Sequence, residues 1–213
     1  MGRAIADRIE AAPDLELGGV WRRGGDIHEV AAQSAVLIDF SLPEALSSVL
    51  AGAKRKGIPL VCGVSGLDEQ QLADIRDAAQ SVAVVYDRNM SAGVAVLENV
   101  VRQAAATLGP DFGVQVHETH HVHKIDAPSG TALKLGEAIA DSLGIDPGDV
   151  HYESERRGEV PGDHTVILSS DTETLSFHHS VTTRDVFADG ALRAARWVIG
   201  KPPGLYSMQD VLV

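Results

Sequence analysis

Residues 36–62, VLIDFSLPEALSSVLAGAKRKGIPLVC, are the stretch that decides the predicted fold. The run VLIDF at 36–40 is almost continuously apolar, which is typical of a strand buried on both faces. Residues 43–55 have helical periodicity, with a proline near the first turn and Ser41 as the expected N-cap. Residues 58–62 are apolar again and predict the next strand. Strand, helix and strand at this spacing indicate a parallel βαβ unit.

The same pattern extends in both directions from this unit. After a turn, a helix is predicted over 69–80 and a strand over 82–86. Before the unit, residues 3–12 predict a helix that ends at Pro13, and residues 15–21 predict a short strand. We therefore expect the first part of the chain to be α/β, with a parallel sheet.

Beyond residue 86 the periodicity changes. The segment FGVQVHETH alternates apolar and polar residues as a half-buried strand does, and a loop and a helix follow it. The elements predicted here are a helix over 92–108, a strand over 112–120, a helix over 131–143, strands over 165–170 and 174–183, and a helix over 189–200. We therefore expect the second part to be α+β, with a mixed sheet.

The composition excludes several classes of function. The chain has 213 residues, with 18 Lys and Arg against 30 Asp and Glu, and its formal net charge is -12. Nucleic acid and anionic membranes require a basic surface, so neither is an expected partner. No apolar run reaches the about 18 residues that a membrane span needs. Cys62 has no partner for an internal disulfide, which favours a reducing compartment, the cytoplasm.

The densest polar cluster is HETHHVHK at 117–124. One interpretation is a solvated loop with incidental histidines. A second is zinc, because the first five residues match H-E-x-x-H, a motif that binds metal only on a helix. The alternation before it predicts a strand, where residues four apart are separated by about 13 Å. That separation is too large for two ligands of one zinc ion, so the pattern disfavours a zinc hydrolase.

A second candidate site begins where the predicted helix opens, at Ser129, Gly130 and Thr131. The first turn of a helix presents backbone N–H groups and the positive end of the dipole, which favour an anion. Lys124 and several imidazoles precede it, so a small carboxylate or phosphate would suit the site. The alternative is a plain serine N-cap without a ligand.

These residues carry a family resemblance. The segment ETHHVHKIDAPSGTAL at 118–133 resembles the signature of the dihydrodipicolinate reductases. Further matching blocks occur in the same order along the chain: IDFSLPE at 38–44, CGVSGLDE at 62–69, NMSAGV at 89–94, GDHTV at 162–166, and FADGALRAARWVIGKPPGLYSMQDVL at 187–212. The resemblance therefore covers nearly the whole chain.

The resemblance implies a two-domain reductase. Residues 1–90 with 186–213 would form a Rossmann-like dinucleotide-binding domain, and residues 91–185 a domain that binds substrate and forms a homotetramer. The implied reaction is the NAD(P)H-dependent reduction of 4-hydroxy-tetrahydrodipicolinate to tetrahydrodipicolinate, in lysine and diaminopimelate biosynthesis. The alternative is a catalytically impaired relative that binds a small dicarboxylate without turnover.

Carried over by position, the resemblance implies a role for each residue of the signature. His120 would be the catalytic acid/base and Lys124 a second proton donor. The substrate carboxylates would be held by His121, Ser129, Gly130 and Thr131. A dianion that accepts hydride needs fixed cationic donors and a proton source, which agrees with these roles.

The cofactor residues follow in the same way. Gly63, Val64 and Ser65 occupy the nicotinamide turn, in which Val64 and Ser65 replace the usual threonines. The second cofactor loop is Asp87, Arg88, Asn89 and Met90. Arg22 and Arg23 stand where an acidic residue usually binds the ribose of NAD, so we expect NADPH to be preferred over NADH. The alternative is two arginines on a solvated turn.

The chain departs from the family pattern at its beginning. The family starts with a strand and the turn G-x-x-G-R-M-G, whereas Met1 and Gly2 resemble only its last two residues. In a sheet ordered 3-2-1-4-5-6 the first strand is central, so we expect the flanking strands to lack a partner between them. One hypothesis is a start codon further upstream; the alternative is a genuinely shorter product that does not bind the cofactor.

Overall fold

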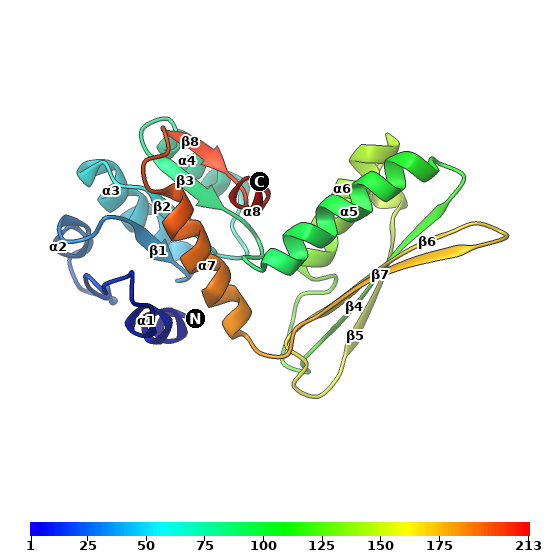
Figure 1. Ribbon diagram of the computed structural model, residues 1–213, viewed down its shortest axis with the longest axis horizontal. Helices are drawn as coiled ribbons and strands as arrows, with labels where there is room; N and C mark the ends of the chain where they lie inside the picture. The colour runs from blue at the N-terminus through cyan, green and yellow to red at the C-terminus, as the bar shows by residue number, and fades with distance from the viewer. The chain divides into compact units, whose positions relative to one another are not determined.

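The computed structural model describes residues 1–213, which divide into two compact units (Figure 1). The first comprises Met1–Ala92 and Asp185–Val213, and the second comprises Gly93–Arg184. Each unit contains its own four-stranded sheet. The first sheet is parallel and the second is mixed, which confirms the predicted fold class. No helix combines the length and the apolar character needed to cross a bilayer.

The sheet of the first unit has the strand order β1-β2-β3-β8, with every neighbouring pair parallel. The strands are β1 (Leu37–Asp39), β2 (Leu60–Cys62), β3 (Ala83–Tyr86) and β8 (Gly204–Tyr206). One face packs against α2 (Ile27–Ala32), α3 (Leu46–Lys56) and α4 (Glu69–Ala78), and the other against α1 (Gly2–Ala11) and α7 (Asp185–Val198). Because helices cover both faces of the sheet, the sequences of these strands are almost continuously apolar.

The expected cap of the helix after β1 is wrong. A 3₁₀ turn, η1 (Pro43–Ala45), comes first, and α3 begins at Leu46 with Ala45 as its N-cap. The residue before a proline favours extended backbone, and Leu42 has ψ 156°, so the helix cannot start at Ser41. Instead, the N–H of Ser41 donates to Oδ1 of Asp39 at 2.9 Å.

The strand predicted over 15–21 is also wrong. These residues form no ladder, and a cavity of about 830 Å³ lies between them and the edge of β1. Its apolar lining includes Ile5, Leu17, Ile38 and Phe40. A strand requires a neighbour that takes up its backbone hydrogen bonds, and these residues have no strand beside them.

Several short elements escape the periodicity analysis. The helix α2 begins at an Asp26 cap, whose carboxylate accepts the N–H of His28 at 2.8 Å. The last helix predicted over 189–200 is α7, which already begins at Asp185. The segment after it, for which no element was predicted, contains β8 and α8 (Met208–Leu212). The elements α2, β8 and α8 are too short for a repeating pattern to be recognised.

The sheet of the second unit has the order β5-β4-β6-β7. Its strands are β4 (Gly113–His120), β5 (His151–Arg156), β6 (Asp163–Ser169) and β7 (Thr174–Ser180), and a 3₁₀ turn, η2 (Pro147–Asp149), precedes β5. Central β4 pairs parallel with β5 and antiparallel with β6. The helices α5 (Ala92–Leu108) and α6 (Gly130–Leu143) cover one face, where Val116, Leu135 and Leu168 are fully buried (Figure 1).

Candidate functional site

The centre of the candidate site is a buried polar cluster at the end of β4. Successive residues of a strand point to opposite faces, so Glu118 and His120 share the face that the helices cover. His164 on β6 lies directly opposite Glu118 in the register and belongs to the same face. These three residues are 1%, 7% and 2% exposed. Polar side chains buried this deeply need hydrogen-bond partners. Glu118 and His120 are bonded to each other, and His164 has its partner in Ser129.

The imidazole of His120 is oriented by Glu118. Nδ1 of His120 is hydrogen-bonded to Oε2 of Glu118. A carboxylate can only accept, so Nδ1 carries the proton and Nε2 of the neutral ring keeps its lone pair. Nε2 faces Gly162, where an added Cβ would lie only 2.9 Å away. Gly162 has φ +151°, a backbone conformation that favours glycine.

Glu118 is held by Arg156 on the neighbouring strand. Nη2 of Arg156 donates to Oε1 at 2.9 Å, and Nη1 donates to Oε2 at 3.1 Å. Burial raises the pKa of the Glu118 carboxyl, but the hydrogen bonds from Arg156, Ser154 and His120 outweigh it, and the net pKa is lowered. Glu118 is therefore an ionised carboxylate at neutral pH.

The pKa of His120 is also lowered. Burial disfavours the imidazolium most strongly, the Glu118 carboxylate opposes this effect, and the charges of Lys124 and Arg156 add to it. His120 is thus a neutral imidazole at neutral pH. A nearby dianion would favour the charged form and raise its pKa, so binding of a dicarboxylate would promote protonation at Nε2.

His164 and Ser129 continue the cluster toward α6. The rings of His164 and His120 make an edge contact, with 5.2 Å between their centroids. Burial, and then the neighbouring His120, lower the pKa of His164 to about 3, so this ring is uncharged at neutral pH. Its Nε2 lies 3.3 Å from Oγ of Ser129, while its Nδ1 is buried without a hydrogen-bond partner.

Ser129 is confirmed as the N-cap of α6. Its Oγ accepts the N–H of Ala132 at 3.1 Å, and the residue is only 2% exposed. The hydroxyl is therefore engaged with the helix and with His164. Gly130 opens the helix, and a Cβ placed there would touch nothing within 4 Å. The end of the helix that favours anions therefore lies beside the imidazoles.

Lys124 lies in the loop between β4 and α6. Its Nζ donates to both carboxylate oxygens of Asp126, each at 2.8 Å. Burial raises the pKa of Asp126, but the hydrogen bond and charge of Lys124, together with smaller effects of the backbone and Arg156, outweigh it, and the net pKa is lowered. His121 follows His120 directly, and its Nδ1 is buried without a hydrogen-bond partner. The side chain of His123 is exposed, with Nε2 3.5 Å from Glu159.

The structure thus brings most of the signature residues into one connected cluster. His164 links His120 to Ser129, and Arg156 links Glu118 to the loop that carries Lys124. Sequence analysis assigned no role to Glu118, Arg156 or His164. Two of them were present in quoted blocks, but only the pairing of β4 with β5 and β6 places them around His120.

The candidate cofactor residues of the two turns, 63–65 and 87–90, lie in the first unit, at the carboxyl ends of β2 and β3, whereas Arg22 and Arg23 lie between α1 and α2. The N–H of Gly63 donates to the carbonyl of Asp39 at 2.8 Å, and an added Cβ would lie 2.5 Å from the ring of Phe40, so only glycine fits. Val64 is buried, with 1% exposure, and Ser65 is exposed. Only the backbone of this turn, together with the Ser65 hydroxyl, can face a ligand.

Two residues of the loop after β3, Asp87 and Met90, hold the fold together and do not face solvent. The Asp87 carboxylate accepts the N–H groups of Asn89 and Met208, each at 3.2 Å, and so anchors α8. Met90 is buried, and a Cβ on Gly190 would collide with its carbonyl. Arg88 is exposed and Asn89 is half-buried, which leaves these two side chains as the ones that reach the surface.

The same edge of the sheet fits a pyridine nucleotide in two further respects. Ligands of open α/β sheets bind beyond the carboxyl ends of the strands. Asp39 ends β1, is 5% exposed, and its Oδ2 is buried without a hydrogen-bond partner, so an acceptor remains for a ribose hydroxyl or an amide. Arg22 and Arg23 are both exposed. The residues at this edge therefore supply hydrogen-bonding atoms that fit the group.

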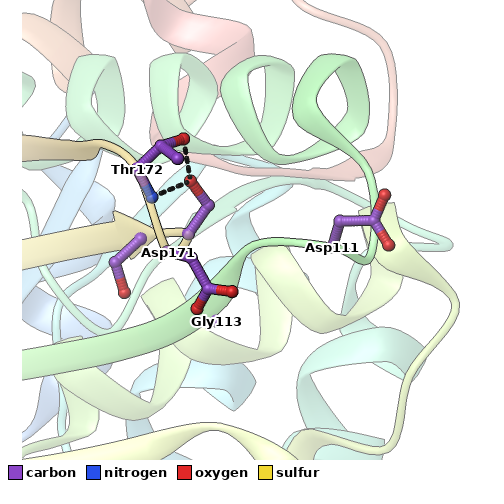
Figure 2. Close-up of a pocket in the computed structure, with 6 residues that line it drawn as sticks. Asp111, Gly113, Asp171 and Thr172 are labelled. Atoms are coloured by element: carbon purple, nitrogen blue, oxygen red, sulfur yellow. Dashed lines mark hydrogen bonds between the residues drawn. The ribbon is translucent and has the colours of Figure 1, made fainter.

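A cavity of about 500 Å³ lies at the other end of β4 (Figure 2). Oγ of Ser170 accepts the N–H of Thr172 at 3.3 Å within it. Its lining is Asp111, Gly113, Ser169, Ser170, Asp171 and Thr172. Hydroxyl and carboxylate groups without a cation do not suit a dicarboxylate ligand. The strand between this cavity and His120 spans roughly 23 Å, at about 3.3 Å per residue.

Comparisons with known proteins match both units. The family model described as "Dihydrodipicolinate reductase, N-terminus" matches residues 1–90, and "Dihydrodipicolinate reductase, C-terminus" matches residues 93–212. A 4-hydroxy-tetrahydrodipicolinate reductase from Halorhodospira halophila is 43% identical, over 89% of this chain and 77% of that protein. Another from Caulobacter vibrioides is 42% identical, over 100% of this chain and 93% of that protein.

Solved structures agree on the fold. A dipicolinate-bound dihydrodipicolinate reductase from Paenisporosarcina sp. TG-14 superimposes with a TM-score of 0.78, at 18% identity, over 98% of this chain and 94% of that one. A DAP dehydrogenase from C. glutamicum in complex with DAP has a TM-score of 0.59 at 13% identity, over 98% of this chain and 89% of that one. At sequence identities this low, the comparison shows only that the folds are alike.

Proposed function

Since this chain belongs to the dihydrodipicolinate reductase family, we propose that its residues carry out the reaction of that family with His120 as the acid/base and Lys124 as a second proton donor. The activity is the NAD(P)H-dependent reduction of 4-hydroxy-tetrahydrodipicolinate to tetrahydrodipicolinate. The observation that carries the assignment of roles is the buried Glu118–His120 contact, which leaves Nε2 of His120 as the reactive end.

The overall reaction consumes one proton and releases one water. When bound, NAD(P)H would supply the hydride, and the substrate hydroxyl would be lost as water. The reduced ring therefore needs a proton as well as a hydride. His120 supplies that proton from Nε2, because the arriving dianion raises its pKa and Glu118 fixes the proton on the other nitrogen.

The substrate carboxylates require cationic and N–H donors. Lys124 provides an ammonium, which must exchange part of its contact with Asp126 for the substrate. Nδ1 of His121 is buried without a hydrogen-bond partner, so an N–H at this atom would be available to donate to a substrate carboxylate. Gly130 and Thr131 form the first turn of α6, where an anion is stabilised, and Ser129 shapes that turn as its cap.

The cofactor site proposed here is the carboxyl edge of the first sheet. The backbone of Gly63 and Val64, together with Ser65, would hold the nicotinamide end. Arg88 and Asn89 would contact it from the next loop, and Asp87 and Met90 would shape that loop from beneath. Arg22 and Arg23 favour NADPH, because guanidinium groups pair with a 2′-phosphate.

Substrate binding and assembly are assigned to the second unit. The face of its sheet opposite α5 and α6 has no helix over it, and Ile167, Thr165 and His117 on it are only half-buried (Figure 1). An uncovered sheet face of this kind is where we place the contact of a homotetramer. Light scattering of the purified chain should give four times the chain mass, and a monomer would contradict this proposal.

The decisive experiment combines binding with turnover. NADPH is titrated by nicotinamide fluorescence with and without pyridine-2,6-dicarboxylate, and NADPH oxidation is followed with enzymatically supplied substrate. The variant His120→Gln should bind both ligands as the wild type does but turn over about 10²- to 10⁴-fold more slowly. Unchanged turnover would contradict the role of His120. Binding without turnover in the wild type would favour the non-catalytic dicarboxylate binder.

A further inference from the structure

We propose that Arg156 is a positioning residue that holds both proton donors, His120 and Lys124, in one arrangement. This inference rests on the proposed function, which assigns those two residues to the reaction. Arg156 itself would touch neither substrate nor cofactor. It would act through the Glu118 carboxylate on one side and through the backbone of the loop after β4 on the other.

Every N–H of the guanidinium is used. Nη1 donates to Oε2 of Glu118 at 3.1 Å and to the carbonyl of Glu155 at 2.7 Å. Nη2 donates to Oε1 of Glu118 at 2.9 Å and to the carbonyl of Asp126 at 2.5 Å. Nε donates to the carbonyl of Lys124 at 3.3 Å. The side chain is therefore held in one orientation.

One branch of these contacts leads to His120. The Glu118 side chain is completely buried, and a carboxylate in that position stays ionised only if cations and donors surround it. The fork of Arg156 holds both of its oxygens, so Oε2 is fixed where it accepts Nδ1 of His120. The tautomer and the direction of Nε2 thus depend on Arg156.

The other branch leads to Lys124. The carbonyls of Lys124 and Asp126, the two residues of the loop ion pair, both accept from the same guanidinium. The loop has few other backbone anchors: Val122 donates to Gly158 at 3.1 Å, and Lys124 donates to His121 at 3.1 Å. Arg156 therefore sets the position of the Lys124 backbone relative to Glu118.

Buried ion pairs also occur for purely structural reasons, and those contribute little net stability. Here both branches end at proposed proton donors, which a structural role would not require. Lysine cannot replace arginine in this role, since an ammonium lacks the planar fork that reaches two carboxylate oxygens and two carbonyls together. Arg156→Lys therefore keeps the charge and removes the geometry.

The main test compares Arg156→Lys with Arg157→Lys. Arg157 is the adjacent residue, has a side chain 63% exposed, and lies 3.6 Å from its carboxylate partner, Glu155, so it is the matched control. We expect kcat of Arg156→Lys to fall about 10- to 100-fold, because misplacement of reacting groups costs rate. The KM for NADPH should not change, and Arg157→Lys should match the wild type.

A second readout does not require activity. Long-range ¹H–¹⁵N spectra report the tautomer of each histidine ring, and His120→Gln identifies the resonance of His120. The charged and titratable groups facing this ring are Glu118, Lys124, Arg156 and His164. We expect a single Nδ1-protonated form in the wild type and a mixture of tautomers with a moved titration midpoint in Arg156→Lys.

The outcomes separate the two claims. If the wild type is inactive but the tautomer change occurs, the proposed function fails and the positioning role stands. If the wild type is active and Arg156→Lys matches Arg157→Lys in kcat and in the spectra, the positioning role is overturned. If Arg156→Lys does not fold, Glu118→Gln takes its place, because it keeps the size of the side chain. It should produce the same mixture of His120 tautomers, and an unchanged spectrum would overturn the inference.

Discussion

Substitution of Gly162 by alanine should impair turnover more than it impairs folding. Gly162 has φ +151°, and its missing Cβ would lie 2.9 Å from Nε2 of His120 and 3.6 Å from Cε1 of His164. A side chain in that backbone region costs about 1–3 kcal/mol. The methyl group also occupies the space in front of the nitrogen that we assign to proton transfer, so His120 must move.

The matched control is Gly158→Ala. Gly158 also has a positive φ, +50°, but a Cβ placed there meets nothing within 4 Å. It should cost about 1–2 kcal/mol of folding free energy through the backbone alone. Because that residue does not contact His120, its kcat should equal that of the wild type.

The assay measures both quantities for both variants. Urea denaturation gives the free energy of unfolding, and NADPH oxidation gives kcat at saturating substrate. Gly162→Ala should lose about 10- to 100-fold in kcat, the range expected when a reacting group is displaced. Equal turnover in Gly162→Ala and Gly158→Ala would refute the argument that Nε2 of His120 is the working end of the ring.

Three further predictions follow from the same structure. The pKa of His164 is about 3 in the folded state and near 6.5 in the unfolded state, so between these values the unfolded state binds more protons. The free energy of unfolding therefore falls as the pH drops through that window, by up to about 1.4 kcal/mol per pH unit. His164→Asn should flatten this slope between pH 4 and 6, and an unchanged slope would contradict the argument. Gly63→Ala should lower the free energy of unfolding by about 1–3 kcal/mol, because its Cβ would overlap the ring of Phe40. Thermal denaturation measures the effect, and a melting temperature equal to that of the wild type would contradict this prediction. Arg22→Ala and Arg23→Ala should weaken NADPH binding while leaving NADH binding unchanged in fluorescence titrations, and equal losses for both nucleotides would exclude contact with the 2′-phosphate.

The parallel βαβ layers could be predicted because their signals are local. The apolar runs at β1, β2 and β3 and the helical periodicity of α3 and α4 lie within short windows, and both faces of the first sheet are buried as those runs require. The short helix α2 and the strand β8 were missed because so few residues cannot establish a period. The strand predicted over 15–21 failed for a different reason, since a strand forms only where a neighbour accepts its hydrogen bonds.

The sequence by itself determined which residues of the signature are chemically suited to a dicarboxylate, and it placed His120, Lys124 and the α6 N-cap in order along the chain. Only the tertiary structure decided what surrounds them. Glu118 and His120 share a face through the two-residue period of β4, but Arg156 and His164 reach them through pairing with β5 and β6, between residues about 35 to 45 positions apart. Strand register depends on the packing of the whole sheet, and no local pattern of residues encodes which distant side chain will lie opposite.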